Sequence, residues 1–149
     1  MSALPSPKIR LTTPADAPDL AELATQLGYP STPEQIAKRL EGLAGKPDEN
    51  AVFVAELGGR VVGWVHVHLY LLLVDDREAE IGGLVVDAGV RGRGLGAQLM
   101  AAAEAWALEQ GCSSVYLRSN TLRTAAHAFY KNLGYSLVKS QYAFRKVLE

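Results

Sequence analysis

The sequence predicts an α/β fold: a mixed, mostly antiparallel sheet of about seven strands with four helices. Apolar residues recur with helical spacing in some segments and with alternating spacing in others, and glycine or turn residues separate these segments. A helix predicted over 95–110 joins two predicted strands, and such a crossover makes the strands parallel. The 149 residues are 48% hydrophobic, which fits a single domain over 1–149 whose first seven residues we expect to be flexible.

The first third of the chain predicts one strand and two helices. Residues 9–12 alternate and predict a strand. Thr13 before Pro14 is a typical helix start, and the helix ends at Gly28. Either Ser31 or Thr32 caps a second helix that begins at Pro33.

The remaining segments predict a meander, a crossover and a strand-rich end. Two turns, Gly58-Gly59 and Asp75-Asp76, separate successive strands. A second short strand follows the crossover helix, and a helix closed by Gly134 comes after it. The predicted strands are 51–57, 60–73, 78–86, 115–118, 137 and 142–147, and the predicted helices are 95–110 and 121–133.

A glycine-rich turn lies between the strand over 81–86 and the helix that follows. It reads Arg91, Gly92, Arg93, Gly94, Leu95, Gly96 and Ala97. A helix that starts this way offers unpaired N–H groups and its positive dipole end to an anion. Alternate glycines let a phosphate chain approach the backbone, and arginine suits phosphate oxygens. The turn therefore predicts a pyrophosphate site, with a flexible loop bearing two solvated arginines as the alternative.

Composition excludes several classes of function. The net charge of −1 gives no basic field for nucleic acid. The longest apolar run, over 69–74, is far too short to cross a bilayer, and the N-terminus does not read as a signal peptide. A single cysteine, Cys112, cannot form an internal disulfide. We expect a cytoplasmic protein that uses neither nucleic acid nor membrane.

Two motifs give the chain a resemblance to a known family. Arg91, Gly94 and Gly96 fill the spacing Arg-x-x-Gly-x-Gly, and the segment 126–135, AHAFYKNLGY, ends a helix with an aromatic pair and Leu-Gly-aromatic. With this order of elements, the chain resembles the GNAT superfamily of N-acetyltransferases. The resemblance implies a central splayed parallel strand pair, acetyl-CoA as co-substrate, and direct acetyl transfer to a primary amine of a small molecule or peptide.

The resemblance also implies where the cofactor lies. The backbone of Leu84, Val85 and Val86 would pair with pantetheine as if it were a strand. The amides of 91–97 would hold the pyrophosphate. The position seven residues before the family's tyrosine is commonly asparagine but is Arg123 here. We therefore expect Asn120 to make the amide contact and Arg123 to lie near the phosphates.

Within the family pattern, Tyr130 is the expected acid that protonates the leaving thiolate, and it lies near the coenzyme A sulfur. Glu80 is the expected base and amine contact, although Glu78 or water could act instead. Strand alternation would place Glu80 on one face with Gly82, Leu84 and Val86. Gly82-Gly83 is either a bulge that opens the strand pair or a simple irregularity.

Tyr29, in the loop after the first helix, could line the amine pocket or pack within its loop. His66 and His68 lie two apart on one strand, but no third ligand is indicated, so we expect no metal.

The alternatives to an acetyltransferase are weaker. A nicotinamide or flavin domain would need an acidic residue after the strand over 115–118, which ends in Arg118-Ser119-Asn120. A non-catalytic acyl-CoA sensor or scaffold of the same fold stays open. Self-association as a homodimer through residues 136–147 is also expected.

Overall fold

The computed structural model describes residues 6–149, so most of the expected flexible N-terminus, residues 1–5, lies outside the described residues. The chain divides into two compact units, the first ending at Leu117 and the second running over Arg118–Glu149, and each is described by itself. The elements of the first unit are β1 (Lys8–Leu11), the short 3-10 helix η1 (Pro14–Asp16), α1 (Ala17–Leu27), α2 (Pro33–Ala44), β2 (Asn50–Leu57), β3 (Arg60–Tyr70), β4 (Glu78–Val86), the 3-10 helix η2 (Ala88–Val90), α3 (Leu95–Glu109) and β5 (Val115–Leu117). The second unit contains α4 (Thr124–Asn132).

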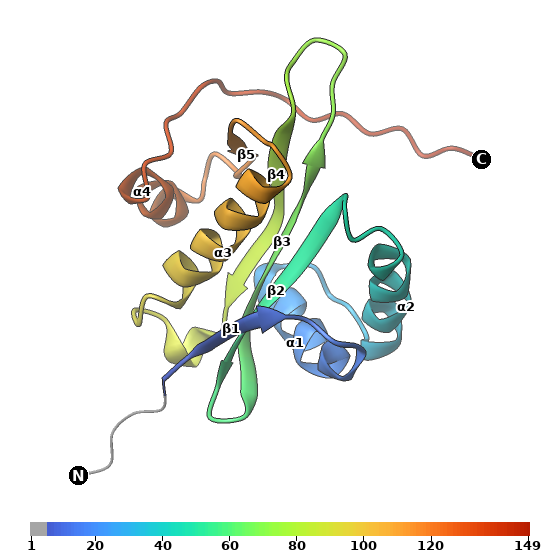
Figure 1. Cartoon of the computed structure of the whole chain (residues 1–149), viewed down its shortest axis with the longest axis vertical. Helices are drawn as coiled ribbons and strands as arrows, with labels where there is room; N and C mark the ends of the chain where they lie inside the picture. The colour runs from blue at the N-terminus through green and yellow to red at the C-terminus, as the bar shows by residue number, and fades with distance from the viewer. Residues whose placement is uncertain (1–5) are drawn as a thin grey trace. The chain divides into compact units, whose positions relative to one another are not determined.

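The strands of the first unit form one sheet in the order β1-β2-β3-β4-β5 (Figure 1). The first three pairings are antiparallel, and β4 pairs with β5 in parallel. The predicted mixed sheet, its parallel pair and the four α-helices are therefore confirmed. The predicted count of seven strands is wrong, because the sheet has five.

The two missing strands are those predicted at 137 and over 142–147. Residues 135–149 have no regular structure, and the apolar side chains that suggested strands are exposed, including Leu137 at 77% and Phe144 at 94%. An alternating pattern becomes a strand only when a neighbouring strand accepts its hydrogen bonds and one face is buried. The self-association expected through this segment stays a prediction.

Helices cover both faces of the sheet in the first unit. On one face, Leu20 and Leu23 of α1 pack with Val54, Val61 and Val85 of the sheet. The helix α2 adds Ile36 and Leu40 at the edge of this cluster. On the other face lies α3, whose Leu99 and Met100 are fully buried. Among the described residues, no helix has the length and apolarity that a membrane span requires.

Local hydrogen bonds start both N-terminal helices where the sequence indicates. At the second helix, Thr32 is the cap: its hydroxyl accepts from the Gln35 N–H at 3.1 Å, and the Gln35 side chain accepts from the Thr32 N–H at 3.0 Å. The first helix is preceded by η1, where the Asp16 carboxylate accepts from the Thr13 N–H at 2.8 Å. These reciprocal bonds fix the entry of the chain into each helix.

Asp16 also connects the start of α1 to the first strand. It is 7% exposed and forms two hydrogen bonds with the Arg10 guanidinium of β1, at 2.9 and 3.0 Å. The Arg10 hydrogen bonds lower the pKa of the Asp16 carboxyl below its ordinary value. A lowered pKa means that the folded state is stabilised at neutral pH and loses this stabilisation as the pH falls through the pKa.

We therefore expect Asp16→Asn to lower the free energy of unfolding at pH 7 by about 2 kcal/mol, because it removes the charge from a buried, hydrogen-bonded pair. The loss should shrink as the pH falls below about 4, where the carboxyl of the unfolded chain takes up its proton before that of the folded protein does. Urea unfolding at both pH values measures the difference. Asp48→Asn, at an exposed turn position, is the control and should change stability little. An Asp16 effect that does not depend on pH would contradict the assignment.

Candidate active site

A bulge between β3 and β4 sets the positions of the polar side chains at the centre of the sheet. Val67 pairs with Ile81, but the next residue of β3, His66, pairs with Gly83, so Gly82 is the extra residue on β4. The bulge reading of Gly82-Gly83 is thus confirmed. Beyond it, Val65 pairs with Leu84. One extra residue shifts the alternation of every side chain that follows.

The bulge overturns the predicted face of Glu80. Residues opposite each other in antiparallel strands project to the same face. Glu80 is opposite His68 and Val85 is opposite Trp64, so these four side chains share the face that α1 and α2 cover. Leu84 and Val86 project to the other face, toward α3. The prediction that Glu80 shares a face with Leu84 and Val86 is wrong, because it assumed uninterrupted alternation.

Glu80 is a buried carboxylate held against a histidine. It is 6% exposed, and its Oε1 lies 3.2 Å from Nε2 of His68. On its other side, Glu80 is paired in register with Tyr116 of β5. The Tyr116 ring stacks on Tyr70 with centroids 5.5 Å apart. The carboxylate therefore lies in the second-to-last strand of the sheet, flanked by a histidine and an aromatic pair.

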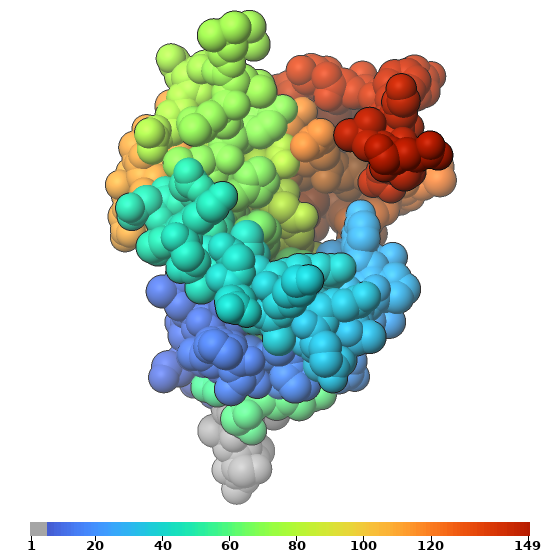
Figure 2. Space-filling model, turned by 90° about the vertical axis from the view of Figure 1, so that its right-hand side faces the viewer, coloured from blue at the N-terminus to red at the C-terminus, as the bar shows by residue number. Residues whose placement is uncertain are grey.

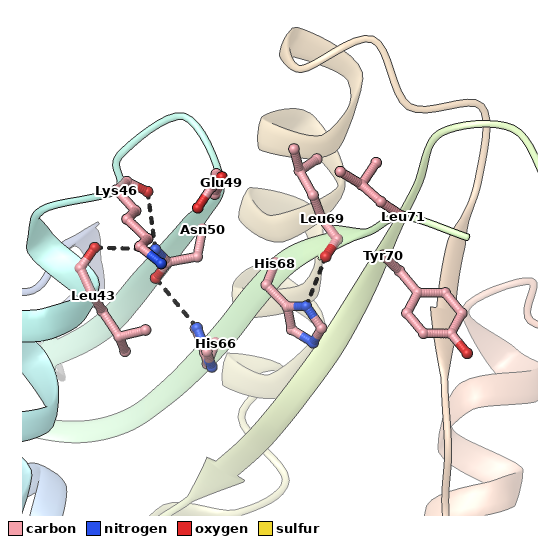
Figure 3. A pocket seen from close by; sticks show the side chains of 9 residues that line it. All are labelled: Leu43, Lys46, Glu49, Asn50, His66, His68, Leu69, Tyr70 and Leu71. Carbon is pink, nitrogen blue, oxygen red and sulfur yellow. Dashed lines mark hydrogen bonds between the residues drawn. The ribbon is translucent and has the colours of Figure 1, made fainter. Parts of the chain in front are cut away.

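The neighbouring His66 belongs to a second hydrogen-bonded group. The Asn50 amide donates to the carbonyls of Leu43 and Lys46, both at 3.0 Å, which orients its Oδ1 toward His66 Nε2 at 3.3 Å (Figure 3). Burial, aided by the charge of nearby His68, lowers the pKa of His66 to about 4. His66 is therefore neutral at physiological pH and donates from Nε2.

Glycines make room for these rings. A Cβ on Gly82 would lie 3.0 Å from Nδ1 of His66 and 3.5 Å from Cδ2 of His68. A Cβ on Gly83 would lie only 2.8 Å from the Trp64 ring. Side chains at the bulge would thus displace the imidazoles and the indole.

An open groove of about 630 Å³ runs along the exposed edges of these rings (Figure 3). It lies between the end of α2 and the outer part of β3, within the first unit. Beyond it, the β3–β4 hairpin projects from the surface, in light green at the top of Figure 2. The groove is lined by Leu43, Lys46, Glu49, Asn50, His66, His68, Leu69, Tyr70 and Leu71.

The parallel pairing of β4 with β5 is short. It covers Ala79 to Ile81 of β4 and ends at Leu117 of β5. The following residues of β4, up to Val86, continue to pair with β3 but are paired with no strand on their β5 side in the described sheet. This leaves one edge of Leu84, Val85 and Val86 open beside the point where the parallel strands part.

The glycine turn begins just after this open edge. Gly92 and Gly94 have left-handed φ angles of 84° and 76°, and no atom lies within 4 Å of where their Cβ atoms would be. Gly94 is the N-cap of α3, and its carbonyl accepts the first helical bond from the Gln98 N–H at 3.1 Å. The N–H groups of Leu95, Gly96 and Ala97 therefore precede the first intrahelical donor and point out of the helix end.

Side chains fix the approach to this turn. The Arg91 Nε donates to the Val86 carbonyl at 3.2 Å, while Arg93 is exposed. The Gln26 side chain at the end of α1 donates to Asp87 at 2.8 Å and accepts from the Ala88 N–H at 3.1 Å. No local pattern in the sequence predicts this contact of Gln26, because its partner lies 61 residues away.

The second unit holds the remaining predicted residues. Asn120 forms a turn before α4: its Oδ1 accepts from the Leu122 N–H at 2.9 Å, and its carbonyl faces Nε2 of His127 at 2.9 Å. Arg123 is the N-cap residue. Tyr130 is half-buried, with Phe129 and Tyr135 edge-on to it at centroid distances of 5.2 and 6.0 Å. Burial raises the pKa of the Tyr130 phenol.

The other candidates differ clearly in surroundings. Glu78 shares the face of Glu80 but accepts a hydrogen bond from the Ser114 hydroxyl at 2.6 Å. Tyr29 follows α1 and is 70% exposed. In the described part of the chain, histidine, cysteine and acidic side chains form no group of three that could hold a metal ion.

The contact of His68 with Glu80 was not predicted from the sequence, although it follows from counting back from the hairpin turn. Pairing Tyr70 with Glu78 across the Asp75-Asp76 turn places His68 opposite Glu80.

Comparison with known proteins agrees with this architecture. The sequence profile described as "Acetyltransferase (GNAT) family" matches residues 17–135. An aminoglycoside N(6')-acetyltransferase type 1 of Stenotrophomonas maltophilia is 32% identical over 149 aligned positions, which cover 97% of this chain and 95% of that protein.

Solved structures show the same fold. The glucosamine-6-phosphate N-acetyltransferase of Arabidopsis thaliana superposes with a TM-score of 0.82 at 23% identity, covering 94% of this chain and 98% of that one. The aminoglycoside N-acetyltransferase AAC(6')-Iy, solved with coenzyme A, has a TM-score of 0.86 at 21% identity and covers 98% of each chain.

Proposed function

The chain belongs to the GNAT family of acetyltransferases, and from this premise we propose that it transfers the acetyl group of acetyl-CoA to a primary amine of a small molecule. The observation that carries the proposal is the open edge of β4, from Leu84 to Val86, leading into the glycine turn at the start of α3. Pantetheine is an amide chain that can pair with such an edge, and a diphosphate suits the N–H groups of a helix start.

The fit of coenzyme A rests on groups of this chain. The left-handed glycines Gly92 and Gly94 keep side chains away from the turn, which leaves its backbone N–H groups accessible. Arg93 and Arg91 add positive charge beside it. Asn120 and Arg123 are assigned to further contacts with the cofactor, and the Asn120 amide NH2 is the donor that its local turn does not use.

The proposed reaction is direct attack. Glu80 takes one proton from the substrate ammonium, and the neutral amine attacks the thioester carbonyl. A backbone N–H near Val86 stabilises the oxyanion. The C–N bond forms, the C–S bond breaks, and Tyr130 gives its phenolic proton to the thiolate and recovers one from the new ammonium. Glu80 is preferred to Glu78 because it contacts His68 of the groove, whereas Glu78 is bonded to Ser114.

The class of acceptor is inferred from one related protein and from the charged residues at the groove. The relative that matches nearly the whole chain is named an aminoglycoside acetyltransferase. Glu49 and Lys46 line the groove, and the Glu80 carboxylate lies behind His68; this excess of carboxylate over ammonium favours a cationic substrate. Tyr29, exposed after α1, is assigned to the acceptor side. We therefore propose a small polyamine or amino sugar in preference to a peptide.

The direct test measures thiol release from acetyl-CoA with a panel of aminoglycosides, polyamines, aminoalkylphosphonates and peptides. We expect turnover with at least one small amine. Tight binding of coenzyme A in calorimetry without turnover on any amine would favour a non-catalytic acyl-CoA sensor. The absence of coenzyme A binding at millimolar concentration would overturn the proposal.

Gly94→Val should weaken coenzyme A binding by at least about tenfold, a loss of 1.4 kcal/mol, because a branched side chain would occupy the approach of the diphosphate. Gly111→Val is the matched control. Gly111 has a similar φ of 80°, follows the other end of α3, and also has no atom within 4 Å of its Cβ position. Both variants carry the same backbone strain, so equal losses of affinity by calorimetry would contradict a specific role for Gly94.

Tyr130→Phe should lower kcat by about 100-fold or more while leaving the Kd for coenzyme A near the wild-type value, because it removes only the proton donor. The raised pKa of Tyr130 keeps the phenol protonated through pH 9, so wild-type kcat should not fall between pH 7 and 9 through loss of this proton. Steady-state kinetics over this range give the measurement. An unchanged kcat in the variant would show that Tyr130 is not the acid.

A further inference from the structure

The imidazole of His68 lies between two hydrogen-bond acceptors. Its Nδ1 is 2.9 Å from the carbonyl oxygen of Leu69, and its Nε2 is 3.2 Å from Oε1 of Glu80. A carbonyl oxygen can only accept, so Nδ1 carries a hydrogen in every charge state of the ring. The neutral form of His68 must then leave Nε2 unprotonated, with its lone pair directed at the Glu80 carboxylate.

In this geometry, His68 and Glu80 can share one proton. Two lone pairs facing each other at hydrogen-bond distance are unfavourable, and a proton between Nε2 and Oε1 removes the conflict. A proton that reaches Glu80 therefore has a basic nitrogen within a single hydrogen bond. The pair can hold it as carboxylic acid and imidazole or as carboxylate and imidazolium.

The two partners differ in their access to water. The side chain of Glu80 is 8% exposed, whereas that of His68 is 31% exposed and lines the groove beside β3. A proton on Glu80 is enclosed by the sheet, whereas the imidazole of His68 reaches the groove. The register pairs the two residues directly, so no third side chain is needed between them.

We propose that His68 is a positioning residue for Glu80 that also carries the proton of the substrate ammonium from the carboxylate to the water of the groove. The inference rests on the proposed function. The ammonium N–H bond breaks as the Oε1–H bond forms; that proton then moves to Nε2, restoring the carboxylate, and leaves to water, restoring neutral His68. No oxidant or other reactant is required, and the sum is one proton released for each amide formed.

His66 serves a different purpose in the same groove. Its Nε2 donates to Asn50 Oδ1, so the neutral ring is protonated on Nε2, the opposite tautomer to that of His68. Its ring centroid lies 5.7 Å from that of His68. With its pKa near 4, His66 adds no charge change at neutral pH.

Several other ionisable groups lie near His68. Glu78 accepts from Ser114. Others are Glu80 on β4, His66 and Tyr70 on β3, Tyr116 on β5, and Lys46 and Glu49 at the loop before β2.

The first test is the pH dependence of kcat/KM in His68→Gln, with the amine that gives turnover. Glutamine can still donate a hydrogen bond to Glu80 but cannot accept a proton. We expect kcat to fall by about tenfold to 100-fold with the KM for acetyl-CoA unchanged. Because the variant lacks the group that accepts the proton of Glu80, its pH dependence of kcat/KM should differ from that of the wild type. In the double variant with Glu80→Gln, His68→Gln should cause no further loss.

The matched control is His66→Gln, on the same strand and in the same groove but bonded to Asn50. This variant should keep the wild-type pH dependence of kcat/KM, whatever its effect on KM. Equal shifts in both variants, or additive losses in the double variant, would overturn the proton route while leaving acetyl transfer itself intact.

A second measurement is independent of turnover. The 15N chemical shifts of the imidazoles should identify neutral His68 as protonated on Nδ1 and neutral His66 as protonated on Nε2. Glu80→Gln should change the Nε2 shift of His68 and leave that of His66 unaltered. A neutral His68 protonated on Nε2 would overturn the proposal. Wild-type protein that binds coenzyme A but acetylates no amine would overturn the proposed function, and the proton route with it.

Discussion

The pairing of β3 with β4 determines where the polar groups of the candidate site lie. Glu80 and His68 meet because they are opposite each other in this register, and the single extra residue Gly82 then reverses the facing of the strand. Before the bulge, Glu78 and Glu80 of β4 project to the sheet face that α1 and α2 cover. After it, Val85 joins the apolar cluster under α1, and Leu84 turns to α3. One glycine thus separates a polar half of the strand from an apolar half.

The same strand also ends its parallel pairing at the bulge. The last residue of β4 that pairs with β5 is Ile81, immediately before Gly82. A bulge increases the local twist of a strand, which makes continued pairing with a straight neighbour harder. The open edge of β4 therefore begins at the bulge. Gln26 then holds the end of the strand against α1 through Asp87 and Ala88.

The sequence predicted those features that depend on local patterns. It located β4 at Glu78–Val86, the start of α3 at Leu95, and the cap of α2 at Thr32 or its neighbour, because caps, glycines and periodicity act over a few residues. It failed where the outcome depends on distant partners. The alternation over 142–147 predicts a strand only if a neighbour pairs with it, and the face of Glu80 depends on a bulge that only the partner strand defines.

A buried carboxylate beside a histidine requires a physical reason. Burying the Glu80 carboxylate carries a desolvation cost, so an apolar pair at the positions of His68 and Glu80 would give a sheet at least as stable. The bulge adds to the cost, since Gly82 and Gly83 are both poor strand residues that make space for the imidazoles and for Trp64. The combination of Glu80, His68 and the two glycines therefore lowers the stability of the sheet at this position. The proposed role of Glu80 as the base accounts for this loss of stability.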